Sequence, residues 1–350
     1  MTANPVRITG TAQHEAWQRR VLPPVEQVRP HVWSIPVPIP RSPLRYTLSY
    51  ALVDDAGIVL VDPGWDTEQG RDAVRAGLAT AGAALTDVTG VVVTHVHPDH
   101  HGLSGWVREQ SGGWIAMHPV EARTLPGRVW RRPRADDQAW LRHHGVPEAD
   151  LVALSVDPDR IAGILTMAAP DRLIEDGDRL PLLSHDIRAV WTPGHTPGHL
   201  CLHDALAGLL LTGDHLLPRI SPTVGVHTPE DDDPLTDYLG SLRRMAAFRT
   251  AEALPAHEYR FRGADTRASE LIAHHRDRGD EILRVLARLG GLSAWAIAAE
   301  LTWSRGWESL HGLPRRLALA ETVAHLHHLA TEGLVKPGPD TPAEWQRVPG

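Results

Sequence analysis

Short apolar segments separated by turn residues fill the first part of the chain and predict paired strands. We expect these strands at residues 32–35, 47–53 and 58–61. Between residues 67 and 82 the apolar side chains recur every three or four positions, which predicts a helix with one buried face. The apolar run Val91–Val93 then predicts a further strand, so this part of the chain mixes α and β structure.

The same alternation returns after residue 172. A turn at residues 173–178 precedes an expected strand at 187–191. A second strand at 209–211 precedes an expected helix at 234–248. Both stretches predict an α/β fold.

The pattern changes to helices beyond Gly263. Amphipathic helices are expected at residues 270–289, 293–301 and 314–330, followed by a closing strand at 333–335. With 350 residues, the chain is long enough for one large domain and a smaller second one. We therefore expect a large domain over residues 1–268 and a small helical domain over residues 269–350.

The segment from about residue 120 to residue 170 is longer than a simple connection requires. Arginines alternate in it with large apolar residues, which are Trp130, Trp140, Leu141, Ile164 and Met167. This apolar content favours a packed helical insert over disorder. As a cap on the large domain, the insert is expected to form the wall of a substrate pocket.

The charge balance and the cysteine content restrict the function further. The formal net charge is −8, whereas proteins that hold a nucleic-acid backbone carry concentrated positive charge, so a nucleic-acid partner is not expected. The sequence shows neither a signal-peptide pattern nor an apolar run of about 20 residues, so we expect a cytoplasmic protein without a membrane partner. Cys201 is the only cysteine and is expected to be a buried structural thiol.

The segment from residue 94 to residue 102 carries the clearest chemical signal. Its residues 95–100 contain four side chains of metal-binding types, which are His95, His97, Asp99 and His100. Side chains of an extended backbone repeat every two residues, so His95 and His97 project the same way and can bind one ion. The proline between the two pairs suits the first turn of a helix, from which Asp99 and His100 can face a second ion.

Three downstream segments also end an apolar run with a histidine or an aspartate, namely His195, Asp214 and His257. An α/β sheet gathers its functional loops at one edge, so these side chains are expected to meet the first four. Imidazole and carboxylate groups suit Zn²⁺ and similar ions. A carboxylate between two cations can bridge them, and Asp214 is the expected bridge.

These residues, in this order and at these separations, resemble the signature of the metallo-β-lactamase superfamily, His-x-His-x-Asp-His followed by a His, an Asp and a final His. The resemblance implies an αββα sandwich. It also implies two metal sites, one formed by His95, His97 and His195, the other by Asp99, His100 and His257, with Asp214 between them. The segments Thr-Pro-Gly-His-Thr-Pro-Gly-His and His-Glu-Tyr look most like the glyoxalase II and thioesterase members. Ala256 departs from their usual glycine, and its methyl group is expected to tighten the loop without removing a ligand.

The C-terminal helices resemble the winged-helix tail of a subset of this superfamily, including the mammalian β-lactamase-like protein with endoribonuclease activity. Acidic residues offset the arginines of this tail, which opposes a role in nucleic-acid binding. We expect a winged-helix-like module for packing or dimerisation, so a homodimer is the expected assembly.

The resemblance implies a dinuclear metal-dependent hydrolase that cleaves a thioester, ester or lactone of a small acyl compound. Two divalent ions, zinc or alternatively iron or manganese, would turn a bridging water into a hydroxide nucleophile, and Asp99 would orient it. The first alternative is an endoribonuclease acting on single-stranded nucleic acid. Further alternatives are β-lactam hydrolysis and a sulfur dioxygenase with one iron ion, whereas a binding module without activity fits an intact metal site least.

Residues on the loops just beyond the expected ligands are the candidates for substrate contact. They are His215, Arg219, His227, Tyr259 and Arg262. The other histidines have ordinary explanations. His199 is expected to support the ligand loop and His118 to be structural, while those at 143–144, 274–275 and 325–328 are expected on helix surfaces.

Overall fold

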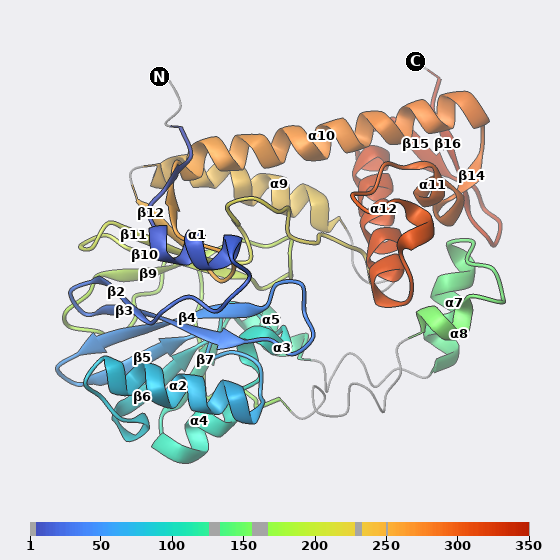
Figure 1. Cartoon of the computed structure of the whole chain (residues 1–350). Helices are drawn as coiled ribbons and strands as arrows, with labels where there is room; N and C mark the ends of the chain where they lie inside the picture. The colour runs from blue at the N-terminus through green and yellow to red at the C-terminus, as the bar shows by residue number, and fades with distance from the viewer. Residues whose placement is uncertain (1–4, 126–133, 156–166, 228–232, 250, 350) are drawn as a thin grey trace. The chain divides into compact units, whose positions relative to one another are not determined.

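The computed structural model describes residues 5–125, 134–155, 167–227, 233–249 and 251–349. The chain forms two compact units. The first comprises Met1–Trp130, Ala162–Pro222 and Ser241–Ser269, and the second comprises Arg131–Ile161, Thr223–Gly240 and Glu270–Gly350. The first unit contains two large sheets, and the second contains helices with a small sheet (Figure 1).

The larger sheet of the first unit has seven strands in the order β2-β3-β4-β5-β6-β7-β8. Its strands are β2 (Glu26–Arg29), β3 (Val32–Pro38), β4 (Tyr46–Asp54), β5 (Gly57–Val61), β6 (Val88–Val92), β7 (Trp114–Met117) and β8 (Arg172–Leu173). Strands β2 to β5 pair antiparallel, whereas β5 to β8 pair parallel. Because β5 and β6 run in the same direction, their carboxyl ends meet at one edge of the sheet.

The second sheet has six strands in the order β1-β13-β12-β11-β10-β9. These are β1 (Arg7–Ile8), β9 (Ile187–Trp191), β10 (Leu200–Asp204), β11 (Leu209–Gly213), β12 (Glu252–Pro255) and β13 (Phe261–Arg262). Strands β11 and β12 pair parallel, and the other neighbouring strands of this sheet pair antiparallel. The carboxyl ends of β11 and β12 therefore also share one edge.

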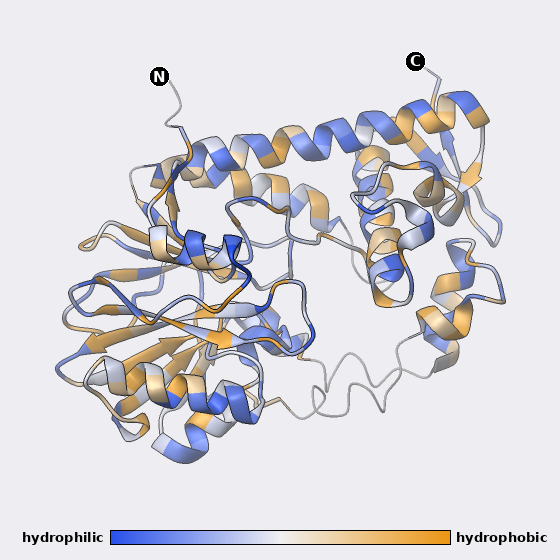
Figure 2. Ribbon diagram, viewed as in Figure 1, coloured by the Kyte–Doolittle hydropathy of each residue, from blue (hydrophilic) through white to orange (hydrophobic). Residues whose placement is uncertain are grey.

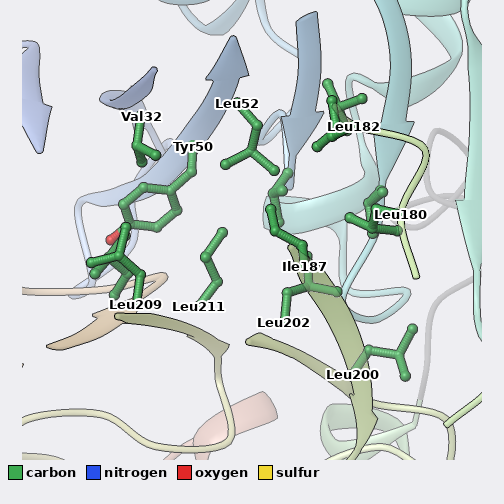
Figure 3. Close-up of a cluster of buried hydrophobic side chains, with 14 of the residues drawn as sticks. Val32, Tyr50, Leu52, Leu180, Leu182, Ile187, Leu200, Leu202, Leu209 and Leu211 are labelled. Atoms are coloured by element: carbon green, nitrogen blue, oxygen red, sulfur yellow. The ribbon is translucent and has the colours of Figure 1, made fainter. Parts of the chain in front are cut away.

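The two sheets bury one hydrophobic cluster between them (Figure 3). Tyr50 and Leu52 of β4 point towards the other sheet, where Leu209 and Leu211 of β11 belong to the same cluster. All four side chains are buried. A fully buried side chain of this size stabilises the folded state by about 1.5–3 kcal/mol. The cluster therefore holds the two sheets together, and with them the strand ends that carry the ligands.

Helices cover the outer faces of this sandwich. The helices of the first unit are α1 (Thr11–Gln18), α2 (Glu68–Thr80), α3 (Pro98–His101), α4 (Ser104–Ser111) and α5 (Pro119–Arg123). Val74 and Leu78 of α2 pack with Ile35 of β3, and Figure 2 shows hydrophobic strands beside a helix of mixed character. On the other sheet, Ser241 in the last turns of α9 (Pro234–Arg244) donates to the carbonyl of Pro193. The expected α/β sandwich is confirmed.

The second unit contains the expected C-terminal helices. Its elements include α7 (Arg134–His143), α8 (Leu151–Leu154), most of α10 (Ala264–Leu289), β14 (Leu292–Ser293), α11 (Ala294–Glu300), α12 (Leu313–Thr331), β15 (Val335–Pro337) and β16 (Glu344–Arg347). The three strands form an antiparallel sheet in the order β14-β16-β15. Ser293 caps α11 as expected, because its hydroxyl accepts from the N–H of Ala296. In the described ranges, no helix is long and apolar enough to cross a membrane.

The insert at residues 120–170 is divided between the two units, which differs from the expected large domain over 1–268. Helices α7 and α8 pack against the C-terminal helices because Arg316 of α12 donates to the carboxylate of Asp137 and to the carbonyl of Leu154. Two of the apolar residues that suggested the insert, Trp130 and Ile164, lie outside the described residues. The winged-helix likeness and the pocket wall stay predictions.

Several histidines expected on helix surfaces are buried instead. The Nδ1 atom of His275 on α10 lies 3.2 Å from Nε2 of His325 on α12, and both side chains are enclosed. His144 is also buried and packs edge-on against Trp140. These three residues lie on the apolar faces of their segments, which the expectation overlooked.

Candidate metal centre

All seven expected ligands meet at the edge of the sandwich where the carboxyl ends of β6, β11 and β12 lie. Their donor atoms form three groups within 4.8 Å, which are His95–His97–His195, His95–His100–Asp214 and Asp99–His100–His257. The first and third groups agree with the two expected triads. Asp214 lies in the group between them, as a bridging carboxylate would.

The first triad consists of three nitrogen atoms at ligand spacing. Nδ1 of His97 lies 2.9 Å from Nε2 of His95 and 3.2 Å from Nε2 of His195. Nitrogen ligands 2.0–2.1 Å from a tetrahedral Zn²⁺ ion stand roughly 3.3 Å apart. The three imidazoles are therefore spaced as ligands of one ion would be.

The second triad faces the opposite oxygen of the central carboxylate. Oδ1 of Asp214 lies 3.2 Å from Nε2 of His257 and 3.5 Å from Nε2 of His100. Its Oδ2 lies 3.7 Å from Nε2 of His195 in the first triad. Asp99 completes the second triad, with Oδ2 3.4 Å from Nε2 of His257. Asp214 thus presents one oxygen to each triad.

Hydrogen bonds behind the ligands decide which nitrogen of each ring faces the centre. Nδ1 of His257 lies 2.9 Å from the carbonyl oxygen of Tyr46, and Nδ1 of His100 lies 2.8 Å from a carboxylate oxygen of Asp62. Both partners accept only, so each Nδ1 carries the proton that it donates. The Nε2 atoms of His257 and His100 consequently face the centre with a lone pair available to an ion.

The same argument assigns His95. The hydroxyl of Thr94 lies 2.7 Å from Oδ2 of Asp62, to which it must donate. Oγ1 of Thr94 can then only accept from Nδ1 of His95, 3.0 Å away. Nε2 of His95 is left for the first triad.

Asp62 is a functional residue that the sequence expectations missed. One carboxylate holds His100 directly and His95 through Thr94, so it supports a ligand in each outer triad. The signal was present, because Asp62 follows the apolar strand β5 just as the ligand segment follows β6. The segment Asp-Pro-Gly suggested only the end of a hairpin, yet Asp62 has a left-handed φ of 52°, which an ordinary residue adopts only under constraint.

The donor set fits a cation. Three buried ligand atoms of this centre make no hydrogen bond within the described part of the chain. They are Nε2 of His100, Nε2 of His257 and Oδ1 of Asp214. A buried polar atom without a partner costs about 1–3 kcal/mol, and Oδ1 of Asp214 lies 3.2 Å from Nε2 of His257 and 3.5 Å from Nε2 of His100. A divalent metal ion would satisfy all three.

The charges of the site give the same result. Burial by itself lowers the pKa of His100, but the charges of Asp214, Asp99 and Asp62 raise that pKa well above its ordinary value. Burial likewise raises the pKa of Asp214, yet His257 and His100 outweigh it and hold the pKa well below the usual range. The carboxylates demand positive charge here, which a metal ion would supply in place of protons.

Two further side chains support the ligand loops. Nε2 of His199 accepts from the backbone N–H of Asp214 at 3.2 Å, and Nδ1 lies 2.8 Å from the hydroxyl of Thr192. This is the supporting role expected for His199. Glu121, which the sequence expectations did not single out, is buried and accepts hydrogen bonds from both ligand loops. Burial raises the pKa of its carboxyl to about 7 although these hydrogen bonds lower it.

The candidate substrate contacts fall in different places. His215 is fully buried behind Asp214, and His227 is exposed in the second unit. Tyr259 is buried against His14 and Trp17. Arg262 of β13 lies opposite Glu252 in the sheet, at the start of β12. His257 follows the other end of β12. The structure does not bring Arg262 to the ligand edge.

Arg219 is the most open of these candidates in the first unit. Its guanidinium lies 4.1 Å from the ring centroid of Trp17, and its side chain is 46% exposed. One nitrogen lies 3.6 Å from the carboxylate of Glu258, the residue after His257. Arg267 steadies the loop by donating to the carbonyls of Leu217 and Ile220. A partly open cation therefore stands on the loop that leaves Asp214.

The family model of the metallo-beta-lactamase superfamily matches residues 42–257, a span that contains all seven expected ligands. The chain belongs to the metallo-beta-lactamase superfamily. It is 25% identical over 311 residues to the probable metallo-hydrolase YqjP of Bacillus subtilis (strain 168), which is 86% of this chain and 92% of YqjP. The protein is therefore a metallo-hydrolase of this superfamily, as the resemblance implied.

Two other comparisons extend over most of the chain. A crystal structure of a metallo-beta-lactamase family protein from Thermus thermophilus is similar with a TM-score of 0.77 and 32% identity, covering 92% of this chain and 100% of that one. An atrochrysone carboxyl ACP thioesterase from Cryptosporiopsis sp. (strain 8999) is 24% identical over 337 residues, covering 91% of this chain and 86% of the thioesterase.

Proposed function

We propose that this metallo-hydrolase binds two divalent metal ions and cleaves a thioester, ester or lactone of a small acyl compound. The two complete triads on either side of Asp214 are the observation that carries the proposal. Seven donors exceed the four that one tetrahedral ion uses, so the set suits a pair of ions. Zinc is the proposed metal, with iron or manganese as alternatives for the same nitrogen and oxygen donors.

Divalent ions in such a centre lower the pKa of a water molecule and polarise the carbonyl group under attack. The residues of this chain supply the remaining steps. Asp99 is 14% exposed, more than the 10% of Asp214, and its Oδ2 faces the centre. We assign Asp99 to orient the attacking water and to accept its proton at a carboxylate oxygen. Asp62 holds the ligand imidazole of His100 in one orientation, and the carbonyl of Tyr46 does the same for His257.

Among these substrates, the chemistry of the leaving group favours a thioester. A thiolate leaves without prior protonation more readily than an alkoxide does, so thioester cleavage demands least of a general acid. The similarity to an ACP thioesterase along 91% of the chain supports the same class. We further propose that Arg219 binds a negatively charged end of the substrate, because its guanidinium is held on Trp17 and still partly open.

A substrate panel tests the proposal. Acyl-CoA thioesters, lactones, nitrocefin and single-stranded RNA would be offered to protein whose metal content is known, with Asp99→Ala as the inactive control. The proposal expects turnover of a thioester, ester or lactone that Asp99→Ala abolishes. Cleavage of RNA without acyl hydrolysis would overturn it in favour of the nuclease alternative, which the net charge of −8 opposes.

A further inference from the structure

Glu121 is a buried carboxylate that the mechanism above does not use. It lies in α5 (Pro119–Arg123), directly after β7, and its side chain is fully buried. Oε1 accepts from the backbone N–H of Val96 at 2.8 Å. Oε2 accepts from the backbone N–H of Gly198 at 2.8 Å and from the hydroxyl of Thr196 at 3.1 Å.

All three donors belong to the loops that carry the first triad. Val96 stands between the ligands His95 and His97, and Thr196 follows the ligand His195. The first loop leaves β6 of the seven-stranded sheet, and the second connects β9 to β10 of the six-stranded sheet. One carboxylate therefore bonds together two loops from opposite sheets, at the point where both must deliver imidazoles to one ion.

Gly198 packs so closely against Glu121 that no larger side chain can replace it. A Cβ atom at Gly198 would lie 2.3 Å from the backbone nitrogen of Glu121 and 2.7 Å from its Cβ atom. Only glycine fits there. The glycine and the threonine of the repeated Thr-Pro-Gly-His motif thus have a physical role that the ligands alone do not explain.

A carboxylate is the group that this position requires. It offers acceptors in two directions, and all its partners here are donors. Glutamine has the same size but only one acceptor oxygen, so its amide would point a donor at Val96 or at Gly198 and Thr196. Each buried donor that loses its partner costs about 1–3 kcal/mol.

We propose that Glu121 is a positioning residue for the metal centre, which sets the separation between His195 and the pair His95 and His97. The inference concerns the first triad and does not depend on the substrate class proposed above. It predicts that changes at Glu121 weaken metal binding rather than the fold as a whole.

The test compares Glu121→Gln with Asp204→Asn in the full-length protein. Asp204 is a matched control because its buried carboxylate also accepts two backbone hydrogen bonds, from Leu206 and Ala207 at 3.0 and 3.1 Å. It lies at the far end of β10 from the centre. Zinc affinity is measured by competition with a chromophoric chelator, and the melting temperature is measured with and without zinc.

We expect Glu121→Gln to lower the affinity for one zinc ion by about 10–100-fold, the usual effect of removing a partner behind a ligand. The rise in melting temperature on adding zinc should shrink accordingly, because stabilisation by a ligand follows its affinity. Asp204→Asn should lower the melting temperature of both forms alike and leave the zinc affinity unchanged. If Glu121→Gln behaves as Asp204→Asn does, Glu121 only stabilises the fold and the inference is wrong.

A milder variant keeps the test decisive if Glu121→Gln does not fold. Thr196→Val removes one of the three donors and keeps the side-chain shape. It should weaken zinc binding in the same direction but less, whereas unchanged affinity would count against the inference. These measurements use no substrate, so failure of the acyl-hydrolase proposal would leave their outcome intact.

Discussion

Nδ1 of His100 lies 2.8 Å from the carboxylate of Asp62, and both side chains are buried. Asp62 directly follows β5, and His100 lies in α3, which follows the neighbouring parallel strand β6. The same carboxylate accepts the hydroxyl hydrogen of Thr94, which in turn holds His95. A residue that is not itself an expected ligand thus controls the orientation of two ligands.

Replacing Asp62 with asparagine should therefore weaken metal binding. Asp62→Asn keeps the size of the side chain but loses one acceptor oxygen, so His100 or Thr94 loses its partner. We expect zinc affinity to fall by about 10–100-fold in a chelator competition. Asp66→Asn is the control, since Asp66 follows on the same connection but pairs with Arg71 at the surface. Equal affinity in both variants would exclude this role for Asp62.

A substitution at Asp99 distinguishes the effect on metal binding from the effect on turnover. Asp99→Ala should abolish measurable turnover while removing only part of the metal, because His100, Asp214 and His257 remain for the second triad. Steady-state assays with the best substrate of the panel and elemental analysis of the same sample measure both effects. A near-normal rate would remove Asp99 from the mechanism.

Arg219→Ala tests the proposed recognition of an anionic substrate. Its loss should raise KM roughly tenfold for substrates that carry a carboxylate or phosphate, while kcat changes little, because such a contact acts equally in the ground and transition states. Arg75→Ala is a matched control, since Arg75 also stacks on a tryptophan, 4.9 Å from the ring centroid of Trp106, and is also exposed. An unchanged KM for charged substrates would exclude Arg219.

The buried histidine His275 makes the second unit sensitive to acid. Burial lowers the pKa of His275 to about 2, and the neighbouring His325 adds to the shift. In the unfolded chain the same imidazole takes up a proton as pH falls through about 6.5. The unfolded state then binds more protons, so the stability that neutral His275 contributes is present above that pH and is lost below it.

Comparison of two neighbouring variants isolates this effect. Between pH 7 and pH 5.5 the free energy of unfolding should fall by roughly 1 kcal/mol less in His275→Gln than in the parent protein. His274→Gln should keep the parental pH dependence, because His274 is exposed on the same helix. Urea unfolding at the two pH values measures the difference. The same pH dependence in His275→Gln as in the parent would show that His275 is not responsible.

The sequence could predict the ligand set because the segments that carry the ligands follow apolar strands. The strand expected at 187–191 is β9 with the same bounds, and the helix expected at 234–248 begins at Pro234 as α9. Periodicity also indicated α2, and the proline in its first turn indicated the start of α12. These elements carry local signals of their own, which can be found without knowledge of distant partners.

The remaining features depend on contacts that a single sequence does not display. The partners of Glu121 lie 25 and 77 residues away, on loops whose meeting depends on both sheets. The packing of α7 against α12 could likewise not be predicted, because it depends on the contact between Arg316 and Asp137, which are far apart in the sequence. His275 was different, because it follows the buried Leu271 by four positions on the same helix face, so its burial could have been foreseen.

The number of metal ions per chain tests the central claim most directly. Elemental analysis of purified protein should give about two divalent ions per chain, and His257→Ala should reduce this to about one, because it removes a ligand of the second triad alone. A reproducible value near one in the parent protein that His257→Ala leaves unchanged would contradict the dinuclear centre.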